Sequence, residues 1–227
     1  MTTYSPLPPP DHAAADIGAV IFDNDGTLVD SEALGFEALL AEARQYGVAM
    51  TVDQAMLLIK GQSMDRCVEI LGRQAGRALP DHFIGDARAA MAQAFRDRLQ
   101  PMAGALAMLH SLTVPFAVAS NGPREKIELT LALTGLLPLF EGRVFSAFDV
   151  GKFKPDPGLF LHAAHALGVP PHRCAIVEDS VAGARAGLAA GMRVYVLASG
   201  QALPPDLAAQ VHTIGELAEL TTMAWNR

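Results

Sequence analysis

The sequence predicts an α/β fold, in which a parallel sheet covered by helices is interrupted by an inserted helical domain. Two observations predict it. Short apolar runs alternate with helical stretches along most of the chain, a pattern that gives a parallel sheet with helices on both faces. Between the first two runs, residues 33–101 contain helical patterns and no strand, far more than the roughly dozen residues that a crossover between parallel strands needs.

Four apolar runs are typical of buried parallel strands: GAVIF (18–22), PFAVAS (115–120), CAIVE (174–178) and RVYVLA (193–198). Helices ending in glycine are expected after them, over residues 31–47, 123–135, 157–168 and 180–191, with Ser31 as a candidate cap of the first. Within the insertion, TVDQ (51–54) predicts a capping box, and further helices are expected over 63–76 and 81–100. The expected division is a flexible N-terminal leader (1–16), an α/β core (17–32 and 102–227) and a helical domain (33–101).

The composition argues against several classes of protein. The 227-residue chain has a net charge of −7, and its 17 basic residues form no cluster, so no nucleic-acid partner is expected. No apolar stretch reaches the ~20 residues of a membrane helix, and the N-terminus lacks the features of a secretory signal. Cys67 and Cys174 lie far apart without metal-site spacing and are expected to be buried, reduced thiols. We expect a cytoplasmic protein without a membrane partner.

Two aspartates follow the first apolar run, where its strand should end. Asp23 and Asp25 are one residue apart; Gly26 then permits a tight bend, and Thr27 offers a hydroxyl to a substrate or a carboxylate. Because ligands of open parallel sheets bind at the carboxyl ends of the strands, both carboxylates are expected to face one ligand. Such a pair suits Mg²⁺, and one carboxylate can attack while the other transfers protons. An isolated Asp-x-Asp is more often a helix-capping turn, so the other strand ends decide between the two interpretations.

Further polar residues stand at the ends of the later runs. Ser120 ends the second run, where a hydroxyl and backbone N–H groups can hold a phosphate oxygen. Glu178 and Asp179 end the third run and add two carboxylates. Lys152 and Lys154, in GKFKPDP, come just before a helix. This order of acid pair, hydroxyl, lysine and acid pair favours a site that handles a phosphate.

Together these segments resemble the haloacid dehalogenase-like superfamily, whose members are mostly Mg²⁺-dependent phosphatases and phosphomutases. The resemblance runs from about Ile17 to the C-terminal region through four motifs: FDNDGTLVDSE, VASNG, KPDP and VEDSVAGARAGLAAGM. It implies a Rossmann-like core. The helical insertion resembles the α-helical cap of the β-phosphoglucomutase and phosphatase branch, in which a monomer is the commonest state.

The resemblance implies roles for the acidic residues. Asp23 would attack phosphorus and form an aspartyl-phosphate. Asp25 would protonate the leaving alcohol and then deprotonate the water that cleaves this intermediate. Mg²⁺ would lie between Asp23, the backbone carbonyl of Asp25 and Asp179, with Glu178 ordering a bound water. Asn24, between the two aspartates, receives no chemical role.

The resemblance also implies how the phosphate is held. Ser120 and Lys154 would hold the phosphoryl oxygens and offset the charge of the transition state. Aligning on Lys-Pro-x-Pro selects Lys154 for this role. Lys152 is expected to be a solvated loop residue and is the second candidate. Asn121 and Thr27 are further candidates for substrate contacts.

The reaction class is narrowed by particular residues. Dehalogenases and phosphonoacetaldehyde hydrolases of this superfamily lack the second aspartate, so Asp25 argues against both. β-Phosphoglucomutase has a histidine and a cap arginine where this chain has Gly35 and Met64, which favours hydrolysis; Arg66 is a possible replacement for that arginine, so the mutase stays an alternative. A non-catalytic phosphosugar-binding module is a further alternative, but every catalytic position is filled.

The cap loop IKGQS (59–63) is expected to face the active site. The stretches SNGPREK (120–126) and FKPDPGLFLHAA (153–164) resemble most the bacterial 6-phosphogluconate phosphatases of this branch. This resemblance implies a phosphorylated sugar or sugar acid as substrate, with Lys60 meeting its carboxylate and Gln62 its hydroxyls. Phosphoglycolate or a 2-deoxyhexose phosphate is the alternative substrate.

Overall fold

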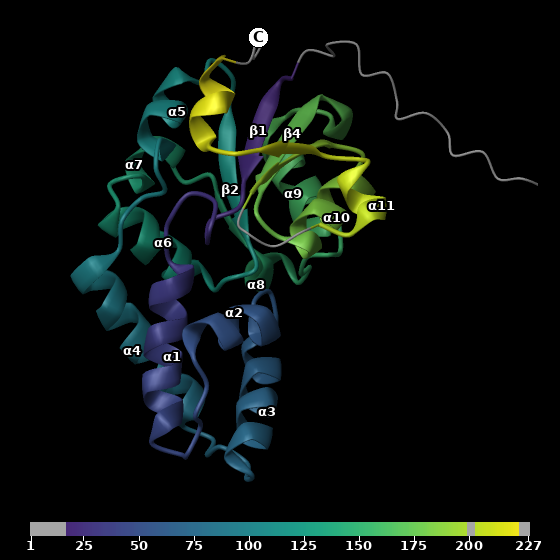
Figure 1. Ribbon diagram of the computed structural model, residues 1–227. Coiled ribbons are helices and arrows are strands. Elements are labelled where there is room, and N and C mark those ends of the chain that lie inside the picture. The colour runs from purple at the N-terminus through teal and green to yellow at the C-terminus, as the bar shows by residue number, and fades with distance from the viewer. Residues whose placement is uncertain (1–16, 199–202, 223–227) are drawn as a thin grey trace, which may run out of the picture.

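The computed structural model describes residues 17–198 and 203–222, so the expected leader lies outside the described residues. It shows a parallel sheet flanked by helices, with a helical lobe at one end (Figure 1). The strands of this sheet, in the order β3-β2-β1-β4-β5-β6, are β1 (Ala19–Phe22), β2 (Phe116–Ser120), β3 (Val144–Ser146), β4 (Cys174–Glu178), β5 (Arg193–Leu197) and β6 (His212–Ile214). The predicted fold class is confirmed.

All four predicted strands are present, and the sheet gains two that the sequence did not reveal. Strands β3 and β6 have three residues each, which is shorter than the apolar runs from which a buried strand can be recognised. Strand β1 lies in the middle of the sheet, paired in parallel with β2 and β4. The carboxyl ends of these three strands therefore lie side by side.

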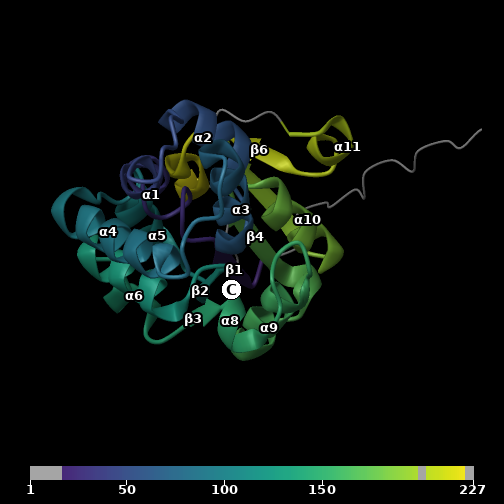
Figure 2. The ribbon, with the colours of Figure 1, turned by 90° about the horizontal axis from the view of Figure 1, so that it is seen from below.

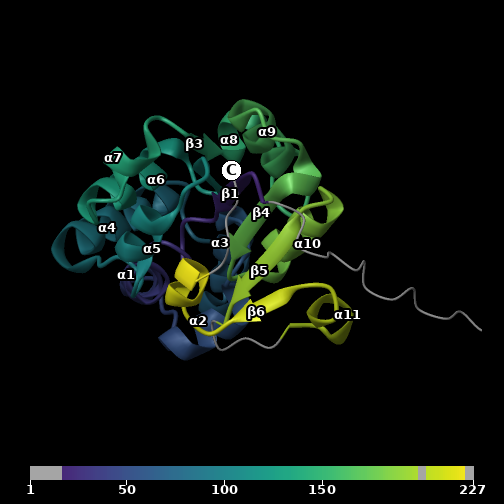
Figure 3. The ribbon, with the colours of Figure 1, turned by 90° about the horizontal axis from the view of Figure 1, so that it is seen from above.

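The two faces of the sheet bury different cores, because successive side chains of a strand point to opposite faces. Val20 and Phe22 of β1 pack into one core, while Ala19 and Ile21 pack into the other. The helices outside the lobe are α5 (Ala105–Ser111), α6 (Arg124–Leu133), α7 (Leu137–Phe140), α8 (Ala147–Val150), α9 (Gly158–Leu167), α10 (Val181–Ala189), α11 (Pro205–Ala208) and the 3₁₀ turns η1 (Pro171–Arg173) and η2 (Leu217–Thr222). Helices α5, α6 and α7 cover one face, and α9 and α10 cover the other (Figure 3).

The lobe is built by α1 (Glu32–Arg44), α2 (Val52–Ile59), α3 (Met64–Ala75) and α4 (Phe83–Arg98). These helices have a core of their own, in which Leu40, Leu71 and Phe83 are buried. The expected capping box starts α2: the Thr51 hydroxyl accepts from the Gln54 N–H at 3.2 Å, and the Gln54 side chain accepts from the Thr51 N–H at 2.9 Å. Viewed from below, α2 and α3 lie in front of the sheet (Figure 2).

Two expectations from composition can be compared with the described residues. Cys67 and Cys174 are buried and unpaired, as expected, and burial raises the pKa of each thiol to about 11. Across residues 17–198 and 203–222, no helix has both the length and the apolar character to cross a bilayer.

Candidate active site

The site lies at the carboxyl ends of the three central strands. Asp23 follows β1 directly, Ser120 is the last residue of β2, and Glu178 is the last residue of β4. The helical lobe lies against this end of the sheet (Figure 1). The polar groups of motifs that are far apart in the sequence therefore meet at one edge, as the parallel topology predicts.

A buried cluster of three carboxylates forms the centre of the site. Asp23, Glu178 and Asp179 each bring an oxygen within 4.8 Å of the others. The Lys154 ammonium lies 2.6 Å from Asp23 Oδ1 and 2.7 Å from Glu178 Oε1. The other oxygen of Glu178 accepts from the N–H groups of Asp179 and Ser180 and from the Ser180 hydroxyl. Glu178 therefore fixes both Lys154 and the turn that leads into α10.

The carboxylates of this cluster are electrostatically crowded. Burial raises the pKa of Asp23 well above its usual value, since the Lys154 charge only partly compensates and neighbouring carboxylates add repulsion. Burial, with repulsion from Glu178 and Glu32, raises the pKa of Asp179 to about 7. Burial disfavours the charged Lys154 ammonium, but the adjacent Asp23 and Glu178 outweigh this and raise its pKa. These shifts all favour the presence of positive charge in the cluster.

Asp25 has a different environment. The Ser31 hydroxyl donates to Asp25 Oδ1 at 2.5 Å, and Lys126 Nζ lies 2.9 Å from the same oxygen. Burial disfavours its charged form, but these two donors outweigh burial and lower the pKa of Asp25. The expected capping role of Ser31 is wrong: its hydroxyl caps no helical N–H and holds Asp25 instead, and α1 begins at Glu32.

The cap loop brings Lys60 into the site. Its ammonium lies 2.6 Å from Glu32 Oε2 and 2.8 Å from Asp179 Oδ2, and its side chain is only 7% exposed. Burial disfavours the charge, but Asp179 and Glu32 outweigh it and raise the pKa of Lys60. The sequence assigns Glu32 no role in advance, although it is the last residue of the first motif, FDNDGTLVDSE.

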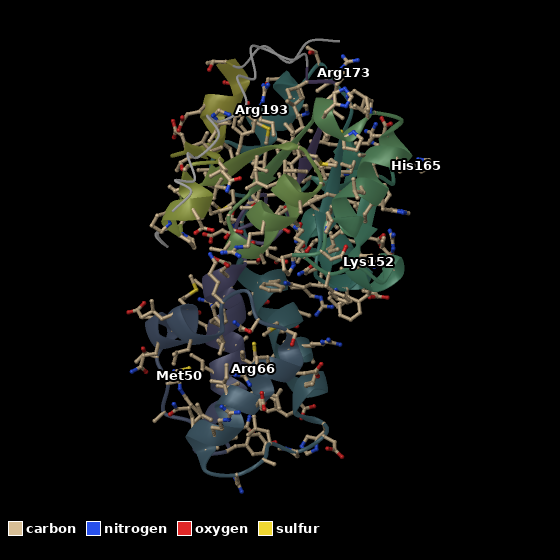
Figure 4. The ribbon with its side chains drawn as sticks, turned by 90° about the vertical axis from the view of Figure 1, so that its right-hand side faces the viewer. Met50, Arg66, Lys152, His165, Arg173 and Arg193 are labelled. Atoms are coloured by element: carbon tan, nitrogen blue, oxygen red, sulfur yellow. The ribbon has the colours of Figure 1, made fainter. Side chains whose placement is uncertain are left out.

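The other cap candidates are placed less centrally. Gln62 is exposed, just beyond Lys60 in the same loop. Arg66 lies within the lobe, paired with Glu69 on the surface of α3 (Figure 4). The structure brings neither of them to the carboxylate cluster.

The remaining candidates divide into groups that support the phosphate site and groups outside it. Ser120 Oγ is buried and accepts from the Gly122 N–H at 3.1 Å, which leaves its own O–H to donate to a phosphate oxygen. The Asn121 amide donates to the Lys154 carbonyl and accepts from the Lys154 N–H, so it holds the lysine's segment. The expected contact between Asn121 and substrate stays a prediction.

Thr27 and Lys152 lie outside the cluster. The Thr27 hydroxyl is completely buried and has no hydrogen-bond partner among the described residues, so the expected contact with a carboxylate is absent. Lys152 is a solvated loop residue on the core, as expected, 3.5 Å from Asp156 (Figure 4).

The donor set fits a small divalent cation. Buried carboxylate oxygens are the ligands that Mg²⁺ prefers. When ionised, five carboxylates face three ammonium groups, and the surplus of two negative charges equals one such cation. These groups are Asp23, Asp25, Glu32, Glu178 and Asp179, and Lys60, Lys126 and Lys154.

Gly26, at φ +76°, allows the loop that follows Asp25 to approach Asp179: a Cβ there would lie 2.5 Å from Asp179 Oδ2.

A second glycine, Gly183 of α10, leads to a stability prediction. Its Cβ would lie 1.7 Å from Glu178 Oε1, and Glu178 is held by Lys154 and by the turn around Ser180. We expect Gly183→Ala to displace this carboxylate, lower the melting temperature and weaken Mg²⁺ binding. The matched control is Gly85→Ala in α4, where a Cβ meets no atom within 4 Å and helix propensity should add about 0.5–1 kcal/mol. A Gly183→Ala protein as stable as Gly85→Ala would contradict this placement of Glu178.

Comparison with known proteins agrees with this geometry. Residues 17–191 match the haloacid dehalogenase-like hydrolase family. The 6-phosphogluconate phosphatase of Escherichia coli is 34% identical over 90% of this chain and 93% of its own. Hexitol phosphatase A of Escherichia coli is 31% identical over 78% and 81%. A HAD family hydrolase from Deinococcus radiodurans, solved with bound phosphate and sodium, superposes with a TM-score of 0.75 at 31% identity, covering 91% of this chain and 94% of its own.

The chain belongs to the haloacid dehalogenase-like hydrolases. The resemblance noted in its four motifs is confirmed, and the phosphatase names of its relatives support the same activity here.

Proposed function

We propose that this protein is a Mg²⁺-dependent phosphatase that hydrolyses a phosphorylated sugar or sugar acid through an aspartyl-phosphate, with 6-phosphogluconate as the leading candidate substrate. The observation that carries the proposal is the meeting of Asp23, Lys154 and Asp179 at one strand edge, beside Asp25. The relatives named 6-phosphogluconate phosphatase and hexitol phosphatase A support the class of substrate.

In the first step, an oxygen of Asp23 attacks phosphorus, the bond between phosphorus and the ester oxygen breaks, and Asp25 gives the leaving alcohol its proton. Lys154 and Ser120 bind the phosphoryl oxygens while this happens. In the second step, Asp25 takes a proton from water, which attacks phosphorus and releases phosphate from Asp23. Asp23, Asp179 and the Asp25 carbonyl would hold a Mg²⁺ ion, which would supply positive charge to offset the charge of the phosphoryl oxygens.

The environment of Asp25 bears on both steps. Its lowered pKa keeps the carboxylate ionised in this arrangement, which is the form that removes a proton from water. To act as an acid in the first step, Asp25 must gain a proton before the ester bond breaks. The two steps then return it to the same protonation state, so one group serves both.

The proposed activity is tested with a panel of sugar phosphates, sugar-acid phosphates, phosphoglycolate and pyridoxal phosphate. We expect phosphate release to be fastest with six-carbon sugars or sugar acids, since a cap of this size can close over them and exclude water. Conversion of β-glucose 1-phosphate to glucose 6-phosphate without phosphate release would instead establish a mutase. A preference for phosphoglycolate would replace the proposed substrate class.

Lys60 gives a sharper test of the sugar-acid substrate. If Lys60 pairs with the substrate carboxylate, Lys60→Ala should raise the KM for 6-phosphogluconate more than the KM for glucose 6-phosphate. We expect a difference of roughly five- to hundredfold, as for a charged pair at a partly closed site. Lys60→Ala also removes the partner of Glu32 and Asp179, but this affects the activity on both substrates equally and cancels when the two KM changes are compared. Lys152→Ala, at an exposed lysine outside the site, is the control, and equal losses on both substrates would reject this role for Lys60.

A further inference from the structure

Helix α6 presents two side chains, one turn apart, to neighbouring residues of the catalytic loop. Lys126 Nζ lies 2.9 Å from Asp25 Oδ1. Four residues further along, Thr130 Oγ1 accepts a hydrogen bond of 3.0 Å from Asn24 Nδ2. Residues four apart lie on the same face of a helix, so both contacts come from one face of α6. The proposed mechanism uses neither Lys126 nor Thr130.

The contact at Thr130 fixes the helix against the loop. Both Asn24 and Thr130 are completely buried, and Thr130 Oγ1 also bonds the carbonyls of Lys126 and Ile127 within α6. A buried polar pair of this kind is costly to break, because the buried Asn24 amide would lose this hydrogen bond with no water to replace it. The register of α6 relative to Asn24 is therefore set, and with it the point at which Lys126 reaches Asp25.

The carboxylate of Asp25 is held from one side. Lys126 and Ser31, from two different segments of the chain, both reach the same oxygen, Oδ1. Two donors on one oxygen restrain rotation of the carboxylate about its Cβ–Cγ bond. The stem of Lys126 passes beside Gly122, where an added Cβ would lie 3.6 Å from Lys126 Cδ and 3.5 Å from Ser120 Oγ. Lys126 thus lies between the turn at Ser120 and Gly122 and the Asp25 carboxylate.

The two catalytic aspartates each have a lysine, but the two lysines differ in exposure. The Lys154 side chain, on Asp23, is 3% exposed, whereas the Lys126 side chain, on Asp25, is 35% exposed. Lys126 also lies 6.0 Å from the centre of the Phe95 ring on α4, which belongs to the lobe. Lys126 is therefore on the more exposed side of the site, between core and lobe.

We propose that Lys126 is a positioning residue for Asp25, and that it holds Oδ1 so that Oδ2 exchanges the proton with the leaving alcohol and with water. The inference rests on the proposed phosphatase function and extends it to a residue on α6. Lys126 takes no part in bond making. Lys126 affects the rate only through the orientation of Asp25. The loss of rate in a Lys126 variant must therefore be larger for a leaving group that requires protonation.

The experiment compares two leaving groups. Glucose 6-phosphate releases a strongly basic alkoxide unless it is protonated, whereas p-nitrophenyl phosphate releases a weakly basic phenolate that leaves without a proton. Neither molecule has a carboxylate that Lys126 could bind directly. The value measured is kcat/KM, which reports the phosphoryl transfer to Asp23 whichever later step limits turnover. The variants are Lys126→Met, Lys126→Arg and the control Lys152→Met at an exposed lysine outside the site.

We expect Lys126→Met to lower kcat/KM for glucose 6-phosphate by about 10- to 100-fold more than for p-nitrophenyl phosphate. This is a fraction of the rate enhancement that a well-positioned general acid provides. Lys126→Arg, which keeps the charge and the donor, should recover much of the loss, and Lys152→Met should change neither substrate. A melting temperature within a few degrees of wild type shows that Lys126→Met is folded; if it is not, Lys126→Arg and Lys126→Gln carry the comparison.

Equal losses on the two substrates, or no loss on either, would overturn the positioning role while leaving the phosphatase intact. Failure of the wild-type protein to release phosphate from any compound would instead overturn the proposed function on which this role rests.

Discussion

Replacing Asp23 with asparagine is expected to lower turnover by about 10⁴-fold or more, as loss of a covalent nucleophile does in other enzymes, while the fold is kept. Asparagine has the size of aspartate and retains a carbonyl oxygen, but it lacks the charge that attacks phosphorus. The measurements are phosphate release and the mass of the protein after brief mixing with substrate. Wild type should show a fraction carrying one phosphoryl group, and Asp23→Asn should show none.

The same substitution should not cost stability. Burial and the neighbouring carboxylates Glu178 and Asp179 disfavour the charge of Asp23, so a neutral amide relieves repulsion. Lys154 keeps Glu178 as its partner at 2.7 Å. The control is Asp30→Asn, which removes an exposed carboxylate seven residues further along and should leave turnover unchanged. Turnover retained by Asp23→Asn would exclude the covalent mechanism.

Removal of the metal should abolish activity. We expect EDTA to stop phosphate release and Mg²⁺ to restore it. The substrate phosphate is negatively charged and must approach three buried carboxylates, so it needs positive charge beyond that of the nearby lysines. Asp179→Ala should raise the Mg²⁺ concentration for half-maximal activity by at least about 10-fold, since even residues that only support metal ligands cost 10–100-fold in affinity when changed.

A binding readout separates the metal from the chemistry. Mg²⁺ at 100 times its dissociation constant should stabilise the wild type by about 2.7 kcal/mol, seen as a higher melting temperature. Asp179→Ala should show a much smaller rise at the same concentration. Asp206→Ala, at an exposed carboxylate on α11 that pairs with Arg185, is the control and should behave as wild type. Full activity in EDTA, or an unchanged Mg²⁺ requirement in Asp179→Ala, would exclude the carboxylate cluster as the site of a catalytic Mg²⁺ ion.

Much of the site could be predicted because parallel strands end at a common edge. Asp23, Ser120 and Glu178 were recognised as polar residues directly after apolar runs, and the structure places each at its strand end. The resemblance to the Lys-Pro-x-Pro motif selects Lys154, and the structure places its ammonium against Asp23 and Glu178. The positions at the strand ends follow from the apolar runs and from the common edge of parallel strands, whereas Lys154 follows from the resemblance to the family motif.

Other features could not be read from sequence, because they depend on which side chains meet across distant segments. Ser31 had the appearance of a helix cap, and only the fold shows that its hydroxyl turns to Asp25. The sequence predicts that Thr27 offers its hydroxyl to a substrate or a carboxylate, and the structure shows this hydroxyl buried without a protein partner in the described part of the chain. A hydroxyl can bond its own backbone or a distant group, and the local sequence does not distinguish the two.

The sequence by itself determined the α/β class, the four central strands, the helical insertion and the positions of the acidic residues that meet in the site, since these follow from hydrophobic period and from residue type at strand ends. Only the tertiary structure decided the lysine partners: Lys126 with Asp25, 101 positions apart, and Lys60 with Asp179, 119 positions apart. Such pairs are formed by the packing of α6 and of the lobe against the sheet. Lysine is common on solvated surfaces, so nothing in its local sequence separates a buried partner of a carboxylate from a charge that faces water.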